Sequence, residues 1–340
     1  MNRRLLVSIV ALSALTLTMA GCTAPGSGSG SSGGASTGSD KVAFVSQVEG
    51  IPYFTGFKAG AEKAAKEFGV SYTQAGPATA DAAEQKRIVD GLVSQGYSAI
   101  AISPLDPTSM NGSISNAVKS GVAVITSDAD APKSDRQVFV SQASDEQLGA
   151  TVLDEIAEQM GGSGQYAIVS GAPDASTFNA WTEAAQAEAA KKYPGLELVG
   201  GIRHTTDSAG ALTEAQNLIT AFPDLKGIIA VPSTAVPGVA QAVQNADRVG
   251  KIAVSGFGSP KTVAQYITSG VMKSSVLWNV QDLGYLTVWA QKQIIDGKDF
   301  QASNDVPGLK EPVLYDASTK TLLLGKPTVF TKENVDKFDF

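Results

Sequence analysis

The sequence contains too little cysteine and histidine for most thiol and metal chemistry. Cys22 and His204 are the only residues of their types among 340, so neither an intramolecular disulfide nor a Cys/His metal cluster can form. Basic residues are outnumbered, with 26 Lys and Arg against 33 Asp and Glu, which argues against a nucleic-acid-binding surface. The short motifs that mark nucleotide-binding proteins, serine hydrolases and zinc proteases are also missing. We therefore expect no enzyme, no metal and no cofactor.

The N-terminal residues indicate export from the cell. The apolar run Leu5–Ala20 is too short for a full membrane span and follows two arginines, which is typical of a signal peptide. The stretch Met19-Ala-Gly-Cys22 resembles the lipobox of bacterial lipoproteins, which implies a signal peptide over residues 1–21 and lipidation of Cys22. The expected location is extracytoplasmic, at the cell membrane, with the lipid as the only membrane contact. The alternative is a secreted protein with an incidental cysteine.

Folding is expected to begin at Lys41. Residues 22–40 are dominated by Gly and Ser, a composition that buries little apolar surface and favours a flexible tether. The rest of the chain is long enough for two domains of ordinary size.

Short apolar strands alternate with amphipathic helices along both halves of the chain. The predicted strands are Val42–Val45, Val70–Thr73, Ala99–Ser103, Val122–Thr126, Tyr166–Val169, Leu196–Val199, Gly227–Val231 and Ile252–Ser255. The predicted helices include Tyr53–Phe68, Asp81–Gln95, Ser109–Ser120, Asn179–Lys192, Ala209–Ala221 and Val236–Asn245. Repeated βα units predict a parallel sheet with helices on both faces. Two such halves predict two lobes, with the carboxyl ends of the strands facing a cleft between them.

Several segments resemble a known family. They are Lys41–Gln47, Gly50–Phe54, Gly121–Asp128, Val276–Tyr285 and Phe330–Phe340. These segments, in this order, are similar to those of type I periplasmic sugar-binding proteins, in particular the branch of rhamnose-binding proteins and autoinducer-2 receptors of ABC importers. The resemblance extends from about Lys41 to the last residue.

The resemblance implies an α/β fold of two doubly wound parallel-sheet lobes joined by a hinge that the chain crosses three times. It assigns residues 41–142 and 280–299 to the N-terminal lobe, and residues 143–279 and 300–340 to the C-terminal lobe. In this family the lobes close on a ligand, and the closed form is presented to a membrane permease. We therefore expect a monomer that works with the permease subunits of an ABC transporter.

A neutral sugar is held by aromatic faces against its C–H groups and by planar polar side chains that bond its hydroxyls. In the first half, Gln47 stands where autoinducer-2 receptors typically have Lys, and it supplies an amide without a charge. Tyr53 and Phe54 open the first helix where family members use aromatic residues, although Phe54 could instead belong to the core. Asp128 matches the family Asp that accepts from sugar hydroxyls. Asp130 is a further candidate, with a turn cap as the alternative.

In the second half, candidates precede and open a predicted helix. Thr177 and Phe178 replace the acid and amide of autoinducer-2 receptors, a change that suits the methyl group of a deoxy sugar. Asn179 is the preferred polar contact, and Trp181 is expected to pack the helix.

Three later segments complete the expected site. Ser233 or Thr234 could donate a hydroxyl, although capping of the next helix is an equally good role. Phe257 follows a strand and is a cleft candidate. Trp278 and Asn279 lie at a predicted crossing and offer a stacking face beside an amide, with core packing at the hinge as the alternative for Trp278.

The expected function is a lipid-anchored substrate-binding protein of an ABC importer for a small neutral sugar or polyol, with a rhamnose-like sugar as the first candidate. A sensor for an autoinducer-2-like compound or a sugar, which passes its closed state to a receptor, is the alternative. An enzyme that uses Asp128 or His204 as acid or base lacks a supporting motif. A transcriptional regulator is excluded because no helix-turn-helix precedes Lys41.

Overall fold

The computed structural model describes residues 40–340. The expected signal peptide over residues 1–21, the lipidation site Cys22 and the tether up to residue 39 lie outside the described residues. Within residues 40–340, no helix combines the length and the apolar character that crossing a membrane requires.

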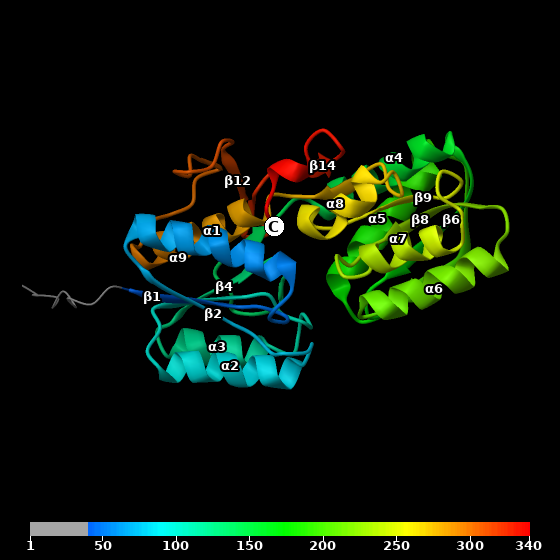
Figure 1. The fold of residues 1–340 in the computed structure, drawn as a ribbon. Helices are drawn as coiled ribbons and strands as arrows, with labels where there is room; N and C mark the ends of the chain where they lie inside the picture. The colour runs from blue at the N-terminus through cyan, green and yellow to red at the C-terminus, as the bar shows by residue number, and fades with distance from the viewer. Residues whose placement is uncertain (1–39) are drawn as a thin grey trace, which may run out of the picture. The chain divides into compact units, whose positions relative to one another are not determined.

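The first of two main sheets has eight strands in the order β11-β12-β13-β5-β4-β3-β1-β2. Its strands are β1 (Lys41–Val45), β2 (Ser71–Ala75), β3 (Ala99–Ile102), β4 (Ala123–Ser127), β5 (Phe139–Ser141), β11 (Ser303–Asn304), β12 (Val313–Asp316) and β13 (Thr321–Leu323). β1 to β5 pair in parallel with one another, and β13 pairs in parallel with β5, whereas the β11–β12 and β12–β13 pairs are antiparallel. The helices are α1 (Pro52–Phe68), α2 (Ala82–Ser94), α3 (Asn111–Lys119) and α9 (Val280–Ile295). Figure 1 shows α1 and α9 on one face and α2 and α3 on the other.

The second main sheet has four parallel strands in the order β7-β6-β8-β9. They are β6 (Ser163–Ser170), β7 (Gly195–His204), β8 (Leu225–Ala230) and β9 (Ala253–Gly256). Its helices are α4 (Asp145–Met160), α5 (Ser176–Lys192), α6 (Ser208–Ala221), α7 (Val236–Asn245) and α8 (Pro260–Thr268). α4 packs against α5, and α6 against α7. The parallel α/β architecture predicted from the sequence is confirmed.

The chain passes between the two sheets three times. It leaves the first sheet after β5, returns at α9 after β10 (Ser275–Leu277), and leaves again after β13 for β14 (Thr328–Phe330), which pairs with β10. A short 3₁₀ helix, Val335–Lys337, then packs against α8.

One part of the expected lobe assignment is wrong. Residues 300–340 were expected in the C-terminal lobe, but β11, β12 and β13 extend the first sheet, where Leu322 of β13 pairs with Val140 of β5. The physical reason is that β4 pairs with only one edge of β5. The other edge would be left unpaired, and β13 pairs with it and contributes the buried Leu322.

Local sequence signals explain the helix ends. Ser144 Oγ accepts a hydrogen bond from Gln147 N at 3.2 Å and caps α4, as the capping box predicts. Asp81 Oδ1 caps α2 through Ala83 N and Glu84 N. Gly69 ends α1 with a φ of 69°, a left-handed conformation that glycine adopts without strain.

The contact between α1 and α9 positions two aromatic residues of the site. A side chain at Gly60 of α1 would collide with the carbonyl of Gln281, and one at Gly284 of α9 would collide with the carbonyl of Phe57. The two glycines therefore allow the helix backbones to approach closely. Tyr53, at the start of α1, and Trp278, just before α9, consequently lie in ring contact, with centroids 5.9 Å apart.

Candidate functional site

A cavity of about 440 Å³ lies where strands of both sheets end. Its lining comes from the residues that follow β1, β3 and β4 of the first sheet and β6, β7, β8 and β9 of the second. This is the place where open α/β sheets bind ligands, because their parallel strands all direct their carboxyl ends to one edge.

Asp128 is the buried acid of this cavity. It follows β4, and its carboxylate is held from both sides by hydroxyl groups of the first lobe. Tyr53 Oη donates to Asp128 Oδ1 at 2.5 Å, and Ser103 Oγ donates to Asp128 Oδ2 at 2.8 Å. Each carboxylate oxygen keeps lone pairs for a further donor. The carboxylate is thus fixed in orientation and can still accept hydrogen bonds from a ligand.

Burial is the main cause of the pKa shifts of Asp128 and Tyr53. Burial raises the pKa of Asp128, and the hydrogen bonds from Tyr53 and Ser103 act in the opposite direction. The pKa of Tyr53 lies well above its usual range, first because the phenol is buried and then because of the Asp128 charge beside it. Tyr53 therefore remains neutral and donates its hydroxyl hydrogen bond to Asp128.

Aromatic rings form a continuous surface along the cavity. The Trp181 and Trp278 rings are 5.7 Å apart, and Trp181 also contacts Phe257 at 4.7 Å and Phe178 at 5.8 Å between centroids. Trp278 connects this group to Tyr53. All of these residues line the cavity, so the site offers faces and edges of aromatic rings to the C–H surface of a ligand.

Trp278 also contributes a free donor. Its side chain is 3% exposed, and its Nε1 makes no hydrogen bond of normal geometry within residues 40–340. It lies close enough to the Tyr53 hydroxyl to act on the pKa of that phenol, in the lowering direction. A buried N–H without a partner is costly, and a ligand oxygen in the cavity would satisfy it.

Gln85 organises the strand ends beneath the cavity. Its buried side-chain amide donates to the carbonyls of Ser46 at 3.1 Å and Ser103 at 2.7 Å, and its Oε1 accepts from Leu105 N at 3.1 Å. Gln47 Nε2 in turn donates to the Pro104 carbonyl at 3.1 Å. The ends of β1 and β3 are therefore tied to each other through α2.

The charge of the lining has one sign. Asp106, Asp128 and Asp174 line the cavity, and of the described residues that do so none is Lys, Arg or His. His204 lies at the end of β7 with its Nδ1 2.7 Å from the Gly171 carbonyl, and it lines an adjoining, more open hollow that shares Ala172, Thr205 and Thr206 with the cavity. The cavity therefore favours a ligand without negative charge.

Most of the candidates from the sequence come together in this cavity. The candidates that line the cavity are Gln47, Tyr53, Phe54, Asp128, Phe178, Ser233, Phe257 and Trp278. Their contact with a ligand stays a prediction.

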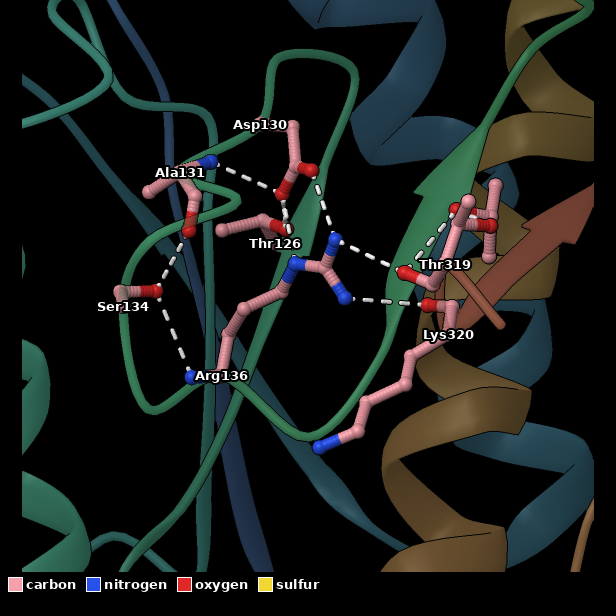
Figure 2. Close-up of polar contacts among 8 residues, drawn as sticks. Thr126, Asp130, Ala131, Ser134, Arg136, Thr319 and Lys320 are labelled. Atoms are coloured by element: carbon pink, nitrogen blue, oxygen red, sulfur yellow. Dashed lines mark hydrogen bonds and ion pairs between the residues drawn. The ribbon is translucent and has the colours of Figure 1, made fainter. Parts of the chain in front are cut away.

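Three candidates do not line the cavity, because their side chains are engaged elsewhere. Asn279 Oδ1 caps α9 by accepting from Gln281 N at 3.0 Å and Asp282 N at 3.3 Å. Asn179 Nδ2 donates to the Pro173 carbonyl at 2.9 Å. Asp130 forms an ion pair with Arg136, which Figure 2 shows. The contact of these three residues with a ligand stays a prediction, which their present partners do not favour.

Sequence reasoning missed two residues of the site and gave a third only one of its two roles. Ser103, which holds Asp128, is the polar residue that ends the apolar strand β3, and its place beside β4 was a usable signal. Gln85 gave no signal, because a glutamine on a helix is ordinary. Trp181 was expected only to pack its helix; it does so, donating from Nε1 to Asp145 Oδ1 at 2.8 Å, and it also lines the cavity.

Comparisons with known proteins agree with this geometry. Residues 42–299 match the family described as "Periplasmic binding protein domain". The D-allose-binding periplasmic protein of Escherichia coli (strain K12) is 29% identical over 252 residues, which cover 72% of this chain and 81% of that protein.

Two solved structures share the fold along their whole length. LsrB from Clostridium saccharobutylicum in complex with AI-2 has a TM-score of 0.82 at 26% identity, covering 88% of this chain and 100% of that chain. An ABC transporter solute binding protein from Clostridium phytofermentas with bound L-rhamnose has a TM-score of 0.81 at 25% identity, covering 89% of this chain and 98% of that chain. Because the family match spans well over half of the sequence, the chain belongs to the periplasmic binding protein family.

Proposed function

We propose that the protein is the lipid-anchored, extracytoplasmic substrate-binding subunit of an ABC importer and that it captures a small neutral sugar or polyol. A rhamnose-like deoxy sugar is the first candidate. Membership of the family supports the binding role, and the similar proteins, one of which binds D-allose and another of which holds L-rhamnose, support the ligand class.

The observation that carries the proposal is the held carboxylate of Asp128 beside aromatic rings. Tyr53 and Ser103 fix both of its oxygens, so it meets a ligand hydroxyl in a set orientation. A carboxylate that accepts from hydroxyl groups is among the stronger contacts a neutral ligand can make. Trp181 and Trp278 supply the apolar surface that the C–H groups of a sugar need.

The cavity also has the size and charge for such a ligand. A volume of about 440 Å³ lies in the range of small-molecule sites. None of the described residues that line the cavity is a Lys, Arg or His that could pair with a phosphate or a carboxylate group. Sugar phosphates and sugar acids are therefore poor candidates.

The proposed mechanism is capture without chemical conversion. The ligand enters between the strand ends of the two lobes, the lobes close about the three crossings, and a permease recognises the closed form. The lipid on Cys22 keeps this monomeric protein beside the permease at the membrane.

Thermal shift and calorimetry on residues 40–340 test the proposal. These residues contain both main sheets and their hydrophobic clusters, so the fold is complete without the N-terminal segment. A ligand that binds only the folded protein raises the melting temperature. We expect a strong shift from one member of a panel of pentoses, hexoses, deoxyhexoses and polyols, with the ligand recovered unchanged. A cooperatively melting protein that responds to none of them contradicts the proposal.

Autoinducer-2 is a second candidate ligand, because the structure of LsrB in complex with AI-2 has a TM-score of 0.82 with this chain. AI-2 therefore belongs in the panel. A shift from AI-2 alone would favour AI-2 over a sugar as the ligand, and a shift from a deoxyhexose alone would favour the sugar.

A further inference from the structure

Asp128 is held in an unusual backbone conformation. Its φ is 73°, and its two neighbours are hydrogen-bonded to each other, because Ala129 N donates to the Ser127 carbonyl at 2.9 Å. A hydrogen bond from residue i+2 to residue i with a positive φ at the centre is the rarer and more strained form of the γ-turn. A residue other than glycine stays in such a turn only where the surrounding structure fixes it.

The two flanks of the turn are bonded to each other. Thr126 Oγ1, two residues before Asp128, donates to Asp130 Oδ1, two residues after it, at 2.5 Å. Ala131 N donates to the same oxygen at 2.8 Å. Asp130 therefore links the residues on both sides of the turn. Asp130 itself does not line the cavity.

Arg136 fixes Asp130 in turn. Its Nε and Nη2 donate to the two oxygens of Asp130, both at 2.7 Å, in a bidentate pair. Its remaining donors reach the turn between β12 and β13, with Nη1 3.0 Å from the Lys320 carbonyl and Nη2 3.2 Å from the Thr319 carbonyl. Figure 2 shows the guanidinium between the carboxylate and these two carbonyls.

The burial of the pair makes this connection rigid. The side chain of Arg136 is 5% exposed and that of Asp130 is 19% exposed, so water competes little for the bonds, unlike at a surface ion pair. The loop that carries Asp128 is thereby attached to a hairpin far along the chain, in the same eight-stranded sheet.

We propose that Asp130 and Arg136 are positioning residues for ligand binding, which hold the strained turn so that the Asp128 carboxylate meets Tyr53, Ser103 and the ligand. The ligand part of this proposal rests on the proposed function. The positioning part does not, because it concerns the place of Asp128 whether or not a ligand is bound.

The main test uses Arg136→Lys. Lysine keeps the positive charge and loses the planar fork that bonds Asp130 and two carbonyls at once. The matched control is Arg248→Lys, because Arg248 also donates to backbone carbonyls, those of Pro223 and Leu225, away from the cavity. Thr126→Val, which removes the bond across the turn, is a second variant should Arg136→Lys fail to fold.

The first measurement needs no ligand. It is the titration of the Asp128 carboxyl carbon by NMR, assigned with Asp128→Asn. The groups that face this carboxylate are the Tyr53 and Ser103 hydroxyls, with the Asp130–Arg136 pair behind the turn. We expect Arg136→Lys to move the titration towards ordinary aspartate values, because a released turn hydrates the carboxylate, and Arg248→Lys to leave it in place. An unchanged titration in folded Arg136→Lys or Thr126→Val overturns the proposal.

The second measurement is the affinity for L-rhamnose by calorimetry in a double-mutant cycle. We expect Arg136→Lys to weaken binding about tenfold in the wild-type background and to change it little in the Asp128→Asn background, because the effect passes through Asp128. An equal loss in both backgrounds indicates a general structural role and overturns the positioning role. If the wild-type protein does not bind L-rhamnose, the first ligand candidate fails and the carboxyl titration decides the positioning role by itself.

Discussion

The two walls of the cavity hold their polar groups differently. On the wall built by the eight-stranded sheet, Asp128, Ser103 and Gln47 all have side-chain hydrogen bonds to other parts of the protein. On the wall built by the four-stranded sheet, the side chains of Ser233 and Thr234 make no hydrogen bond to any residue that the structure describes, and aromatic rings dominate. The first wall holds its polar groups in place, whereas the second wall offers hydroxyl groups that are free to adapt.

This difference assigns different tasks to the walls. Groups that are already held in place lose little freedom when a ligand binds, so they contribute more affinity and more selectivity. Free hydroxyls must be ordered on binding, and aromatic faces accept many orientations of a ring. We expect the first wall to select the ligand and the second to cover it.

The largest expected effect is the loss of the Asp128 charge. Asp128→Asn keeps the shape of the side chain and removes the charged acceptor, so ligand binding should weaken about 100-fold, as for a lost hydrogen bond to a charged group. Calorimetry with the panel's best ligand measures it. The control is Asp174→Asn, which makes the same change at an exposed residue of the opposite wall. Equal losses in the two variants would remove the distinction between the walls.

The same substitution should have an opposite effect on stability. Burial raises the pKa of Asp128 in the folded protein, so its contribution to the free energy of unfolding is full below pH about 4 and is lost as pH rises through the raised pKa. Asp128→Asn cannot ionise and escapes this loss. Urea denaturation should therefore find Asp128→Asn more stable than the wild type at pH 7, with the gap closing towards pH 4. A gap that does not change with pH would show that burial does not destabilise the ionised carboxylate.

The sequence predicted the sheets well because their signals are local. The alternation of apolar and polar residues acts within a few residues, and α1 and α2 begin and end within two residues of the expected positions. The place of β13 could not be predicted in the same way. The segment Thr321–Leu323 is too short to show an alternation of apolar and polar residues, and its partner β5 lies far away in the sequence.

Part of the site was predictable, namely the residues that stand at the ends of helices and strands. Tyr53, Asp128 and Trp278 were found from their places at the ends of elements. Whether a side chain turns to the cavity or to its own backbone depends on a rotamer and a local partner. Asn279 caps α9 and Asp130 pairs with Arg136 for that reason, although both stand beside residues that line the cavity.

A smaller effect is expected from the hydroxyl that holds Asp128. Tyr53→Phe keeps the ring against Trp278 and removes the donor to Asp128 Oδ1, so binding should weaken about fivefold, as for one neutral hydrogen bond. Because the bond from Tyr53 lowers the pKa of Asp128, the carboxyl titration should also move to higher pH. Tyr266→Phe is the control, since that hydroxyl lies near Gln241, away from the cavity. A tighter-binding Tyr53→Phe would mean that Tyr53 competes with the ligand for Asp128.

The smallest effect is expected on the adaptable wall. Ser233 lines the cavity after β8 with a hydroxyl that no described residue holds, so any bond to a ligand is offset by the rotational freedom that the side chain loses. Ser233→Ala should therefore weaken binding by less than about twofold, which displacement calorimetry with a weaker panel member resolves. The informative comparison is with Ser103→Ala, the same change on the preorganised wall, where the loss of the bond to Asp128 Oδ2 should cost several times more affinity. If Ser233→Ala proves the more damaging of the two, the second wall selects the ligand and the assignment of tasks is reversed.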